Sequence, residues 1–115
     1  MKSPITTHVL DTARGRPAVG VHVILEVYTP SKDWKELARG ETNIDGRVTD
    51  LLPESTQLTS GTYRLTFLTS AYFRSVGLEG FYPYIPVVFD LKEPNLHYHI
   101  PLLLSPYGYS TYRGS

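Results

Sequence analysis

The side chains best suited to acid–base chemistry in this sequence are its four histidines, and the chain contains no cysteine. An imidazole has an ordinary pKa of about 6.5, so it can accept a proton from water near neutral pH and return it. His97 and His99 are separated by one residue, a spacing that places both rings on the same face of a strand. His8 lies near the start of the sequence, whereas His22 is best interpreted as a polar surface residue of a strand.

His97 and His99, with His8 as a third ligand, could also form a metal site of the kind that strands build from histidines. No carboxylate is obviously placed as a fourth ligand or as an orienting partner, so this alternative depends on the spacing alone. The absence of cysteine excludes a thiolate metal site, a disulfide scaffold and thiol catalysis.

A charged group of a second kind follows Asp45-Gly46, the strongest hairpin signal in the sequence. Arg47 comes directly after this pair and is therefore expected at a strand start beside a tight turn. A guanidinium stays charged at every working pH and offers a planar fork of donors. The last four residues, Tyr112-Arg113-Gly114-Ser115, directly follow a strand-like run, where most chains have a loose polar tail.

Short runs rich in β-formers, separated by turn residues, make up most of the sequence. The predicted strands span residues 5–12, 20–28, 34–43, 61–70, 81–91, 96–105 and 107–113. A short helix is predicted over 70–80, with Ser70 as its cap and Gly77 at its end. Pro86 within the run 81–91 favours an edge strand or a bulge. About seven short strands with regularly spaced turns predict an all-β fold, a sandwich or a barrel.

Alternation along these strands indicates which side chains share a surface. In the first strand His8 lies on the same face as Thr6 and Leu10, opposite Ile5, Thr7 and Val9. In the run 96–105 the more continuous apolar face consists of Tyr98, Ile100, Leu102 and Leu104. His99 therefore points away from the core. His8, His99 and Tyr112 project from one outer surface if their strands are neighbours.

Composition narrows the class of function. The chain has 11 basic and 11 acidic residues and no net charge, which argues against a nucleic-acid-binding protein. No apolar stretch approaches the length of a membrane span, and the start of the sequence lacks the apolar region of a signal peptide. We expect one domain over residues 1–115, located in the cytoplasm. The peroxisome is the alternative, although an RGS ending is not a peroxisomal tripeptide.

Two long motifs carry a resemblance to a known family. The segments THVLDTARGRPA (7–18) and HYHIPLLLSPYGYSTYRGS (97–115) strongly resemble the transthyretin-related proteins, the 5-hydroxyisourate hydrolases of urate degradation. NIDGR (43–47) and FYPYIPVVF (81–89) are similar to that family as well. The terminal YRGS is the most discriminating motif. Transthyretin, the hormone carrier, shares the fold but lacks YRGS and has other residues where the hydrolases place histidine and arginine.

This resemblance implies a transthyretin-like β-sandwich of two four-stranded sheets with one short helix. It also implies a homotetramer, a dimer of dimers, whose active sites lie in the channel at the dimer–dimer interface, with no cofactor and no metal. Motif matching implies catalytic groups at His8, Arg47, His99 and Ser115. It implies substrate-binding groups at His8, Arg47, Tyr112 and Arg113, of which the last two would shape and close the pocket.

The reaction that the resemblance implies is hydrolysis of 5-hydroxyisourate to 2-oxo-4-hydroxy-4-carboxy-5-ureidoimidazoline by water attack on a ring amide. Such a step needs a deprotonated water, stabilisation of the oxyanion and a proton for the departing nitrogen. His8 and His99 are candidates for water activation and proton return, in either order. Arg47 suits the substrate edge or the developing charge, and Ser115 would orient a histidine or bind the substrate.

Two other functions stay open at this point. A transthyretin-like carrier would bind small hydrophobic ligands in the same channel, since a fold does not fix a function. A carrier, however, has no need of a water-activating set of side chains. The metal-binding sandwich built on His97, His99 and His8 is the other alternative, and metal analysis with chelation would separate it from the hydrolase.

Overall fold

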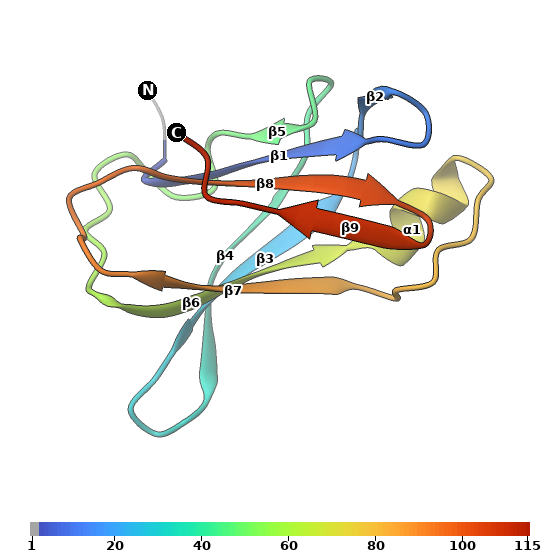
Figure 1. The fold of residues 1–115 in the computed structure, drawn as a ribbon. Helices are drawn as coiled ribbons and strands as arrows, with labels where there is room; N and C mark the ends of the chain where they lie inside the picture. Colours follow the sequence, from blue (N-terminus) through green and yellow to red (C-terminus); the bar gives the residue numbers. More distant parts are fainter. Residues whose placement is uncertain (1–2) are drawn as a thin grey trace.

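Residues 3–115, which the computed structural model describes, form two β-sheets packed face to face and one short helix (Figure 1). The first sheet has the order β2 (Arg16–Pro17), β1 (Ile5–Asp11), β8 (Tyr98–Ser105) and β9 (Gly108–Thr111), and β5 (Arg47–Val48) also pairs with β1. The second sheet has the order β4 (Trp34–Glu41), β3 (His22–Tyr28), β6 (Gly61–Leu68) and β7 (Ile85–Leu91). The helix α1 (Thr69–Ser75) follows β6. The predicted all-β sandwich is confirmed, and the two-residue strands β2 and β5 both pair with the side of β1 that faces away from β8.

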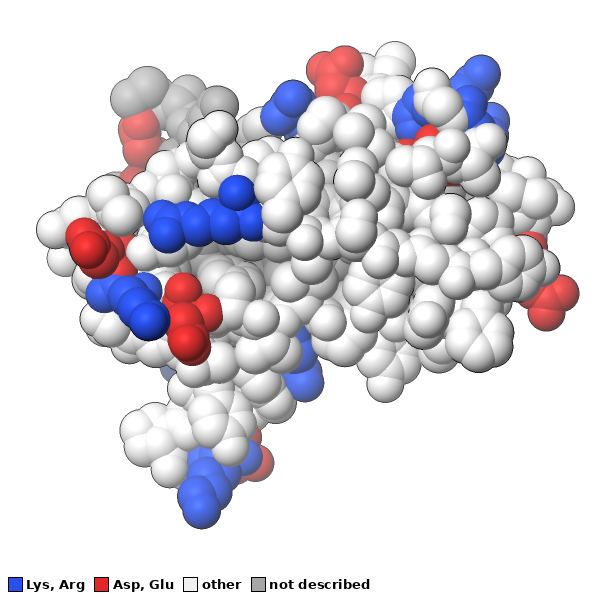
Figure 2. Space-filling view, in the orientation of Figure 1, with Lys and Arg blue, Asp and Glu red and all other residues white. Residues whose placement is uncertain are grey.

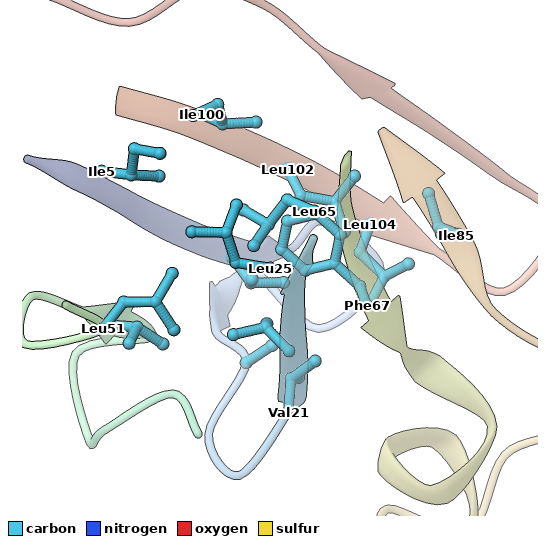
Figure 3. Packing of buried hydrophobic residues seen from close by; sticks show 14 of the residues in the cluster. Ile5, Val21, Leu25, Leu51, Leu65, Phe67, Ile85, Ile100, Leu102 and Leu104 are labelled. Atoms are coloured by element: carbon cyan, nitrogen blue, oxygen red, sulfur yellow. The ribbon is translucent and has the colours of Figure 1, made fainter. Parts of the chain in front are cut away.

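The core lies between the two sheets and is built from the alternating apolar side chains of both (Figure 3). Its members on β8 are Tyr98, Ile100, Leu102 and Leu104, all buried. Burying one such side chain contributes about 1.5–3 kcal/mol. A strand has a side-chain period of two, so burial of this face commits His99 to the opposite, outer face, as predicted.

The strand that was predicted from residue 81 begins later in the structure, because of the prolines and the turn before β7. β7 begins at Ile85, and the segment before it is held by a bond from the Phe81 N–H to the Pro106 carbonyl at 2.7 Å. Pro86 lies within β7, which is an edge strand of its sheet. An edge position is one where the missing N–H of proline is tolerated, so the expectation from Pro86 is confirmed.

The helix begins differently from the prediction. Its N-cap residue is Leu68 and no side chain caps it, so the prediction of a Ser70 cap was wrong. Ser70 lies inside the first turn, and its hydroxyl donates to the Pro83 carbonyl at 2.8 Å. Because β6 runs directly into α1, no loop residue is available as a cap. The end was predicted correctly, since Gly77 follows the helix with a positive φ of 74°.

The Asp45-Gly46 turn is tight but does not close a hairpin, so that part of the prediction was wrong. β4 belongs to the second sheet and β5 pairs with β1 in the first, so the chain crosses between sheets at this turn. Asn43 Oδ1 accepts the N–H groups of Asp45 and Arg47 at 2.9 and 3.0 Å. Gly46 has φ +75°, and a Cβ atom there would lie 2.5 Å from the Val9 carbonyl oxygen. Glycine therefore allows the turn to lie against β1.

Tyr72 fastens α1 to the end of β1. Its hydroxyl donates to Asp11 Oδ2 at 2.6 Å, and both residues are buried. Burial and, after it, the bond to Asp11 raise the pKa of Tyr72 to about 12. This contact therefore links α1, which follows β6 of the second sheet, to β1 of the first sheet.

Replacing Tyr72 with phenylalanine should destabilise the protein and change its response to alkali. At neutral pH we expect a loss of about 1–3 kcal/mol, because the buried Asp11 carboxylate loses a donor. The raised pKa makes the contribution of Tyr72 fully present below pH 10 and lost as the pH rises through about 12. Urea unfolding across this range measures both effects, with the exposed Tyr84→Phe as the control. An identical alkaline loss in Tyr72→Phe and the wild type would contradict the assignment.

Candidate active site

Strand β1 positions the candidate residues, because segments from remote parts of the sequence pair with its two sides (Figure 1). On one side the antiparallel register places Arg47 of β5 opposite His8. On the other side the parallel register places His99 of β8 opposite Thr6. His8 and Thr6 share one face of β1, so the groups gather on the outer surface of the first sheet.

His8 is half-buried, and its Nε2 lies 2.9 Å from the carbonyl oxygen of Asp45. A carbonyl can only accept, so the His8 Nε2–H donates and, in the neutral ring, Nδ1 carries the lone pair. Burial and, after it, the charge of Arg47 lower the pKa of His8 below 6.5. Neutral His8 therefore predominates at neutral pH and can act as a proton acceptor.

Replacing Arg47 with glutamine should raise the pKa of His8 towards, but not to, its ordinary value. The larger cause, burial, remains in this variant. NMR titration of the His8 ring measures the midpoint, and Arg39→Gln, which removes an exposed arginine paired with Glu36, is the matched control. A lowered histidine pKa also means that His8 destabilises the fold as the pH falls below about 6.5. A wild-type midpoint above 6.5, or one that does not respond to Arg47→Gln, would contradict the prediction.

The end of the chain lies directly against His99. The Gly114 N–H donates to the His99 carbonyl at 2.8 Å, and the two residues form an isolated bridge. A Cβ atom on Gly114 would lie 2.6 Å from His99 Cδ2. Figure 1 shows the last residues turning from β9 back across β8 towards β1. Only glycine allows the backbone to approach the imidazole this closely.

A small polar hollow brings several candidates together. Its volume is about 60 Å³, and its lining consists of Thr6, Thr7, Arg47, Thr49, His97, His99 and Ser115. Arg47, His99 and Ser115 of the sequence-predicted site thus meet here. His8 is not part of this lining but is directly opposite Arg47 in the β1–β5 pair. A guanidinium, imidazoles and hydroxyls around one space form a set of hydrogen-bond donors and proton carriers.

The other two predicted residues, Tyr112 and Arg113, line a separate hollow of about 310 Å³ between β7 and the β8–β9 pair. The Arg113 guanidinium carbon lies 4.9 Å from the centre of the Tyr98 ring, whose side chain belongs to the buried face of β8. The side chains of successive residues in an extended chain point to opposite faces. The Arg113 side chain therefore points away from the face on which a side chain at Gly114 would lie. Only His99 among the predicted site residues lines both hollows.

Thr6 is the residue that sequence reasoning missed. Its Oγ1 lies 3.0 Å from His97 Nε2 and 2.8 Å from His99 Nδ1. Alternation already placed Thr6 on the face of His8. The unknown was the parallel register that brings β8 alongside, since no local pattern encodes the pairing of strands this far apart in sequence.

The three histidines of the metal-site alternative already contact protein groups. The ring nitrogens of His97 and His99 meet at the Thr6 hydroxyl, and His8 Nε2 is bonded to the Asp45 carbonyl. Within the described residues, no group of three or more His, Cys, Asp or Glu side chains is arranged to hold a metal ion. The metal-site alternative therefore has no support from the geometry of residues 3–115.

The strand order, the helix after β6 and an outer face bearing imidazoles and a guanidinium define a transthyretin-like sandwich with acid–base groups. Residues 5–114 match the model of the HIUase/Transthyretin family, and the chain belongs to this family. Within residues 3–115, no helix is long and apolar enough to cross a membrane.

Proteins of both branches of the family are similar to this chain. The 5-hydroxyisourate hydrolase of Mus musculus is 50% identical over 114 residues, which cover 98% of this chain and 96% of that protein. The structure of Klebsiella pneumoniae 5-hydroxyisourate hydrolase is 37% identical with a TM-score of 0.84, covering 96% of this chain and 97% of that one. Sea bream transthyretin in complex with thyroxine is 34% identical with a TM-score of 0.90, covering 97% and 95%. Backbone similarity therefore does not separate hydrolase from carrier, and the side chains must.

Proposed function

We propose that this chain hydrolyses 5-hydroxyisourate in urate degradation, as the names of its similar relatives suggest. One structural observation carries the proposal. Arg47 lies opposite His8 on the strand pair and lines one polar hollow together with His99 and Ser115. Imidazoles beside a fixed positive charge suit water activation and oxyanion stabilisation, whereas a site that only holds a hydrophobic ligand requires neither.

In the proposed reaction, water attacks the ring amide carbonyl while an imidazole nitrogen takes a proton from the water. His8 and His99 are the candidates for this role, and neutral His8 offers its Nδ1 lone pair. Negative charge develops on the carbonyl oxygen, where the Arg47 guanidinium stabilises it. The C–N bond then breaks, and the imidazolium returns the proton to the departing nitrogen.

The end of the chain supplies the binding groups in this proposal. Ser115 lines the small hollow with Arg47 and His99, where its hydroxyl can orient an imidazole or bond to the substrate. Tyr112 is 57% exposed and shares the larger hollow with His99 and Arg113. We therefore assign Tyr112 and Arg113 to contacts with the substrate from that second side.

We further propose that the active molecule is a homotetramer, a dimer of dimers. A hollow of about 60 Å³ has room for a few water molecules but not for a bicyclic substrate. A second copy placed over the outer face would complete the site. Light scattering at assay concentration tests this assembly, and a fully active monomer would overturn it.

The edges of the sheets support pairing between copies. β7 is an edge strand of one sheet and β9 of the other, and residues of both strands line the hollow of about 310 Å³. Val88 on β7 and Tyr109 on β9 are exposed at 56% and 42%. In Figure 2 the charged side chains on this face lie mainly around its rim, and its middle is uncharged. Edge strands with unpaired backbone N–H and C=O groups can pair with the same strands of another copy.

The test of the proposed function is the decay of the transient absorbance of freshly generated 5-hydroxyisourate. We expect the protein to accelerate this decay in proportion to its concentration. An unchanged decay in the presence of folded protein would overturn the proposal.

Location in the cytoplasm is likewise a proposal, drawn from the sequence alone.

The second candidate function is a carrier of small hydrophobic ligands, which is favoured by one observation. The fold matches a thyroxine complex of sea bream transthyretin with a TM-score of 0.90. Thyroxine binding measured by calorimetry, together with the decay assay, separates the two candidates. Tight binding without hydrolysis would establish the carrier.

A further inference from the structure

The hydroxyl of Thr6 lies between two imidazole rings. Its Oγ1 is 3.0 Å from His97 Nε2 and 2.8 Å from His99 Nδ1, and Thr6 is only 3% exposed. The two rings are nearly parallel, with an interplanar angle of 21° and centroids 6.4 Å apart. The hydroxyl therefore bridges a solvent-exposed histidine and a candidate catalytic one.

The hydrogen count restricts what this bridge can do. A hydroxyl has one hydrogen to donate and two lone pairs that accept. When it donates to one neutral ring, it can accept an N–H only from the other ring. The nitrogens of His97 and His99 that face Thr6 therefore cannot both accept from it, and whenever the hydroxyl hydrogen points to one of them the other must donate.

We propose that Thr6 is a positioning residue that couples the protonation of His97 to the tautomer of His99. When His97 is neutral and accepts at Nε2, the hydroxyl donates to it and accepts the His99 Nδ1–H. His99 then carries its lone pair on Nε2, the form that a base requires. This inference rests on the proposed function, because its consequence for catalysis requires His99 to act on water.

Protonation of His97 reverses the arrangement. Both nitrogens of an imidazolium carry hydrogen, so His97 Nε2 donates to the Thr6 hydroxyl. The hydroxyl then turns its own hydrogen towards His99 Nδ1. His99 is held in the Nε2–H form, which can give a proton but cannot take one. The net change is one added proton: His97 Nε2 becomes protonated, while His99 loses the hydrogen on Nδ1 and binds one at Nε2 by exchange with solvent.

His97 is placed to exchange protons with solvent. It lines the small hollow and also an open groove of about 940 Å³ whose lining includes Glu54. The charged and titratable groups that line these spaces with His97 are Glu54 in the groove and Arg47 and His99 in the hollow. A change in solvent pH can thus alter the tautomer of His99, through the protonation of His97 and the orientation of the Thr6 hydroxyl.

The experiment is imidazole ¹⁵N NMR of the substrate-free protein, because the two neutral tautomers differ in their nitrogen shifts. When His97 is neutral, we expect His99 in the Nδ1–H form. Thr6→Val removes the hydroxyl and should release this preference, whereas Thr6→Ser keeps the hydroxyl and should retain it. His97→Ala leaves the hydroxyl hydrogen to His99 and should convert His99 to the Nε2–H form. His22→Ala, on the surface of the other sheet, is the matched control.

Kinetics supply the second readout. His97→Ala should lower kcat at least about tenfold with little change in KM, because the wrong tautomer cannot take the proton. Thr6→Val leaves both tautomers populated and should lower kcat by a smaller factor. Thr6→Ser should retain both the wild-type kcat and the wild-type pH dependence of kcat on the acid side. An unchanged His99 tautomer in both Thr6→Val and His97→Ala would overturn the coupling. His97→Ala alone decides the question if Thr6→Val does not fold, since His97 is exposed. A tautomer that responds in a protein without hydrolytic activity would support the coupling and overturn the proposed function.

Discussion

His8→Ala, Arg47→Ala and His99→Ala should each lower the rate of 5-hydroxyisourate hydrolysis by about a hundredfold or more. General acid–base catalysis and oxyanion stabilisation each supply a factor of this order, and each variant removes one of the two. All three side chains lie on the outer face of the first sheet rather than in the core, so the fold should survive. The measurement is the initial rate of absorbance decay, with thermal unfolding to verify the fold.

Matched control variants distinguish the loss of a catalytic group from a nonspecific effect of substitution. His22→Ala removes an exposed histidine of β3, and Arg39→Ala removes an exposed arginine of β4 that pairs with Glu36. Neither residue belongs to the first sheet, so both variants should retain the wild-type rate. A fully active His99→Ala protein would remove His99 from the mechanism, and the same outcome for Arg47→Ala would remove the oxyanion role.

Gly114→Ala should lower kcat strongly although it adds a single methyl group. The new Cβ would lie 2.6 Å from His99 Cδ2 and 3.2 Å from the His99 carbonyl oxygen. The ring must therefore move away from the position that the Thr6 hydroxyl holds. A displacement of about 1 Å at a catalytic group can cost about a hundredfold in rate. We expect a loss of at least about tenfold in kcat.

The control for this variant is Gly61→Ala. A Cβ there would meet its nearest atom, Tyr63 Cε1, at an ordinary 4.0 Å, so fold and rate should be unchanged. The His99 ring signals in an NMR spectrum should shift in Gly114→Ala and stay in place in Gly61→Ala. A fully active Gly114→Ala protein would contradict the structural role assigned to the terminal YRGS motif.

Local patterns in the sequence predicted the faces of the strands well. The apolar alternation of 96–105 is buried as predicted, because a period of two fixes which side chains point inward. The same alternation placed His8 and His99 on an outer surface. The helix end at Gly77 was equally readable, since its positive φ favours glycine.

What the sequence could not provide is the relation between segments that are distant along the chain. The Asp45-Gly46 signal predicts a turn correctly, but only the pairing of β5 with β1 shows that the turn links two sheets. Ser70 has the chemistry of a cap, yet the uninterrupted passage from β6 to α1 gives it no capping position. The terminal YRGS motif reads as one unit, whereas in the structure Tyr112 and Arg113 line one hollow and Ser115 lines the other.

The parallel pairing of β1 with β8 has a consequence for how the protein is made. Thr6 and His99 are 93 residues apart in sequence, yet they lie opposite each other on adjacent strands. The first strand leaves the ribosome long before β8 has been synthesised, and until then this side of β1 has no partner strand. Contacts of such high sequence separation slow folding and lengthen exposure to aggregation. The gain of activity should therefore mark the last stage of folding, and molecular chaperones should have most to protect in the interval before it.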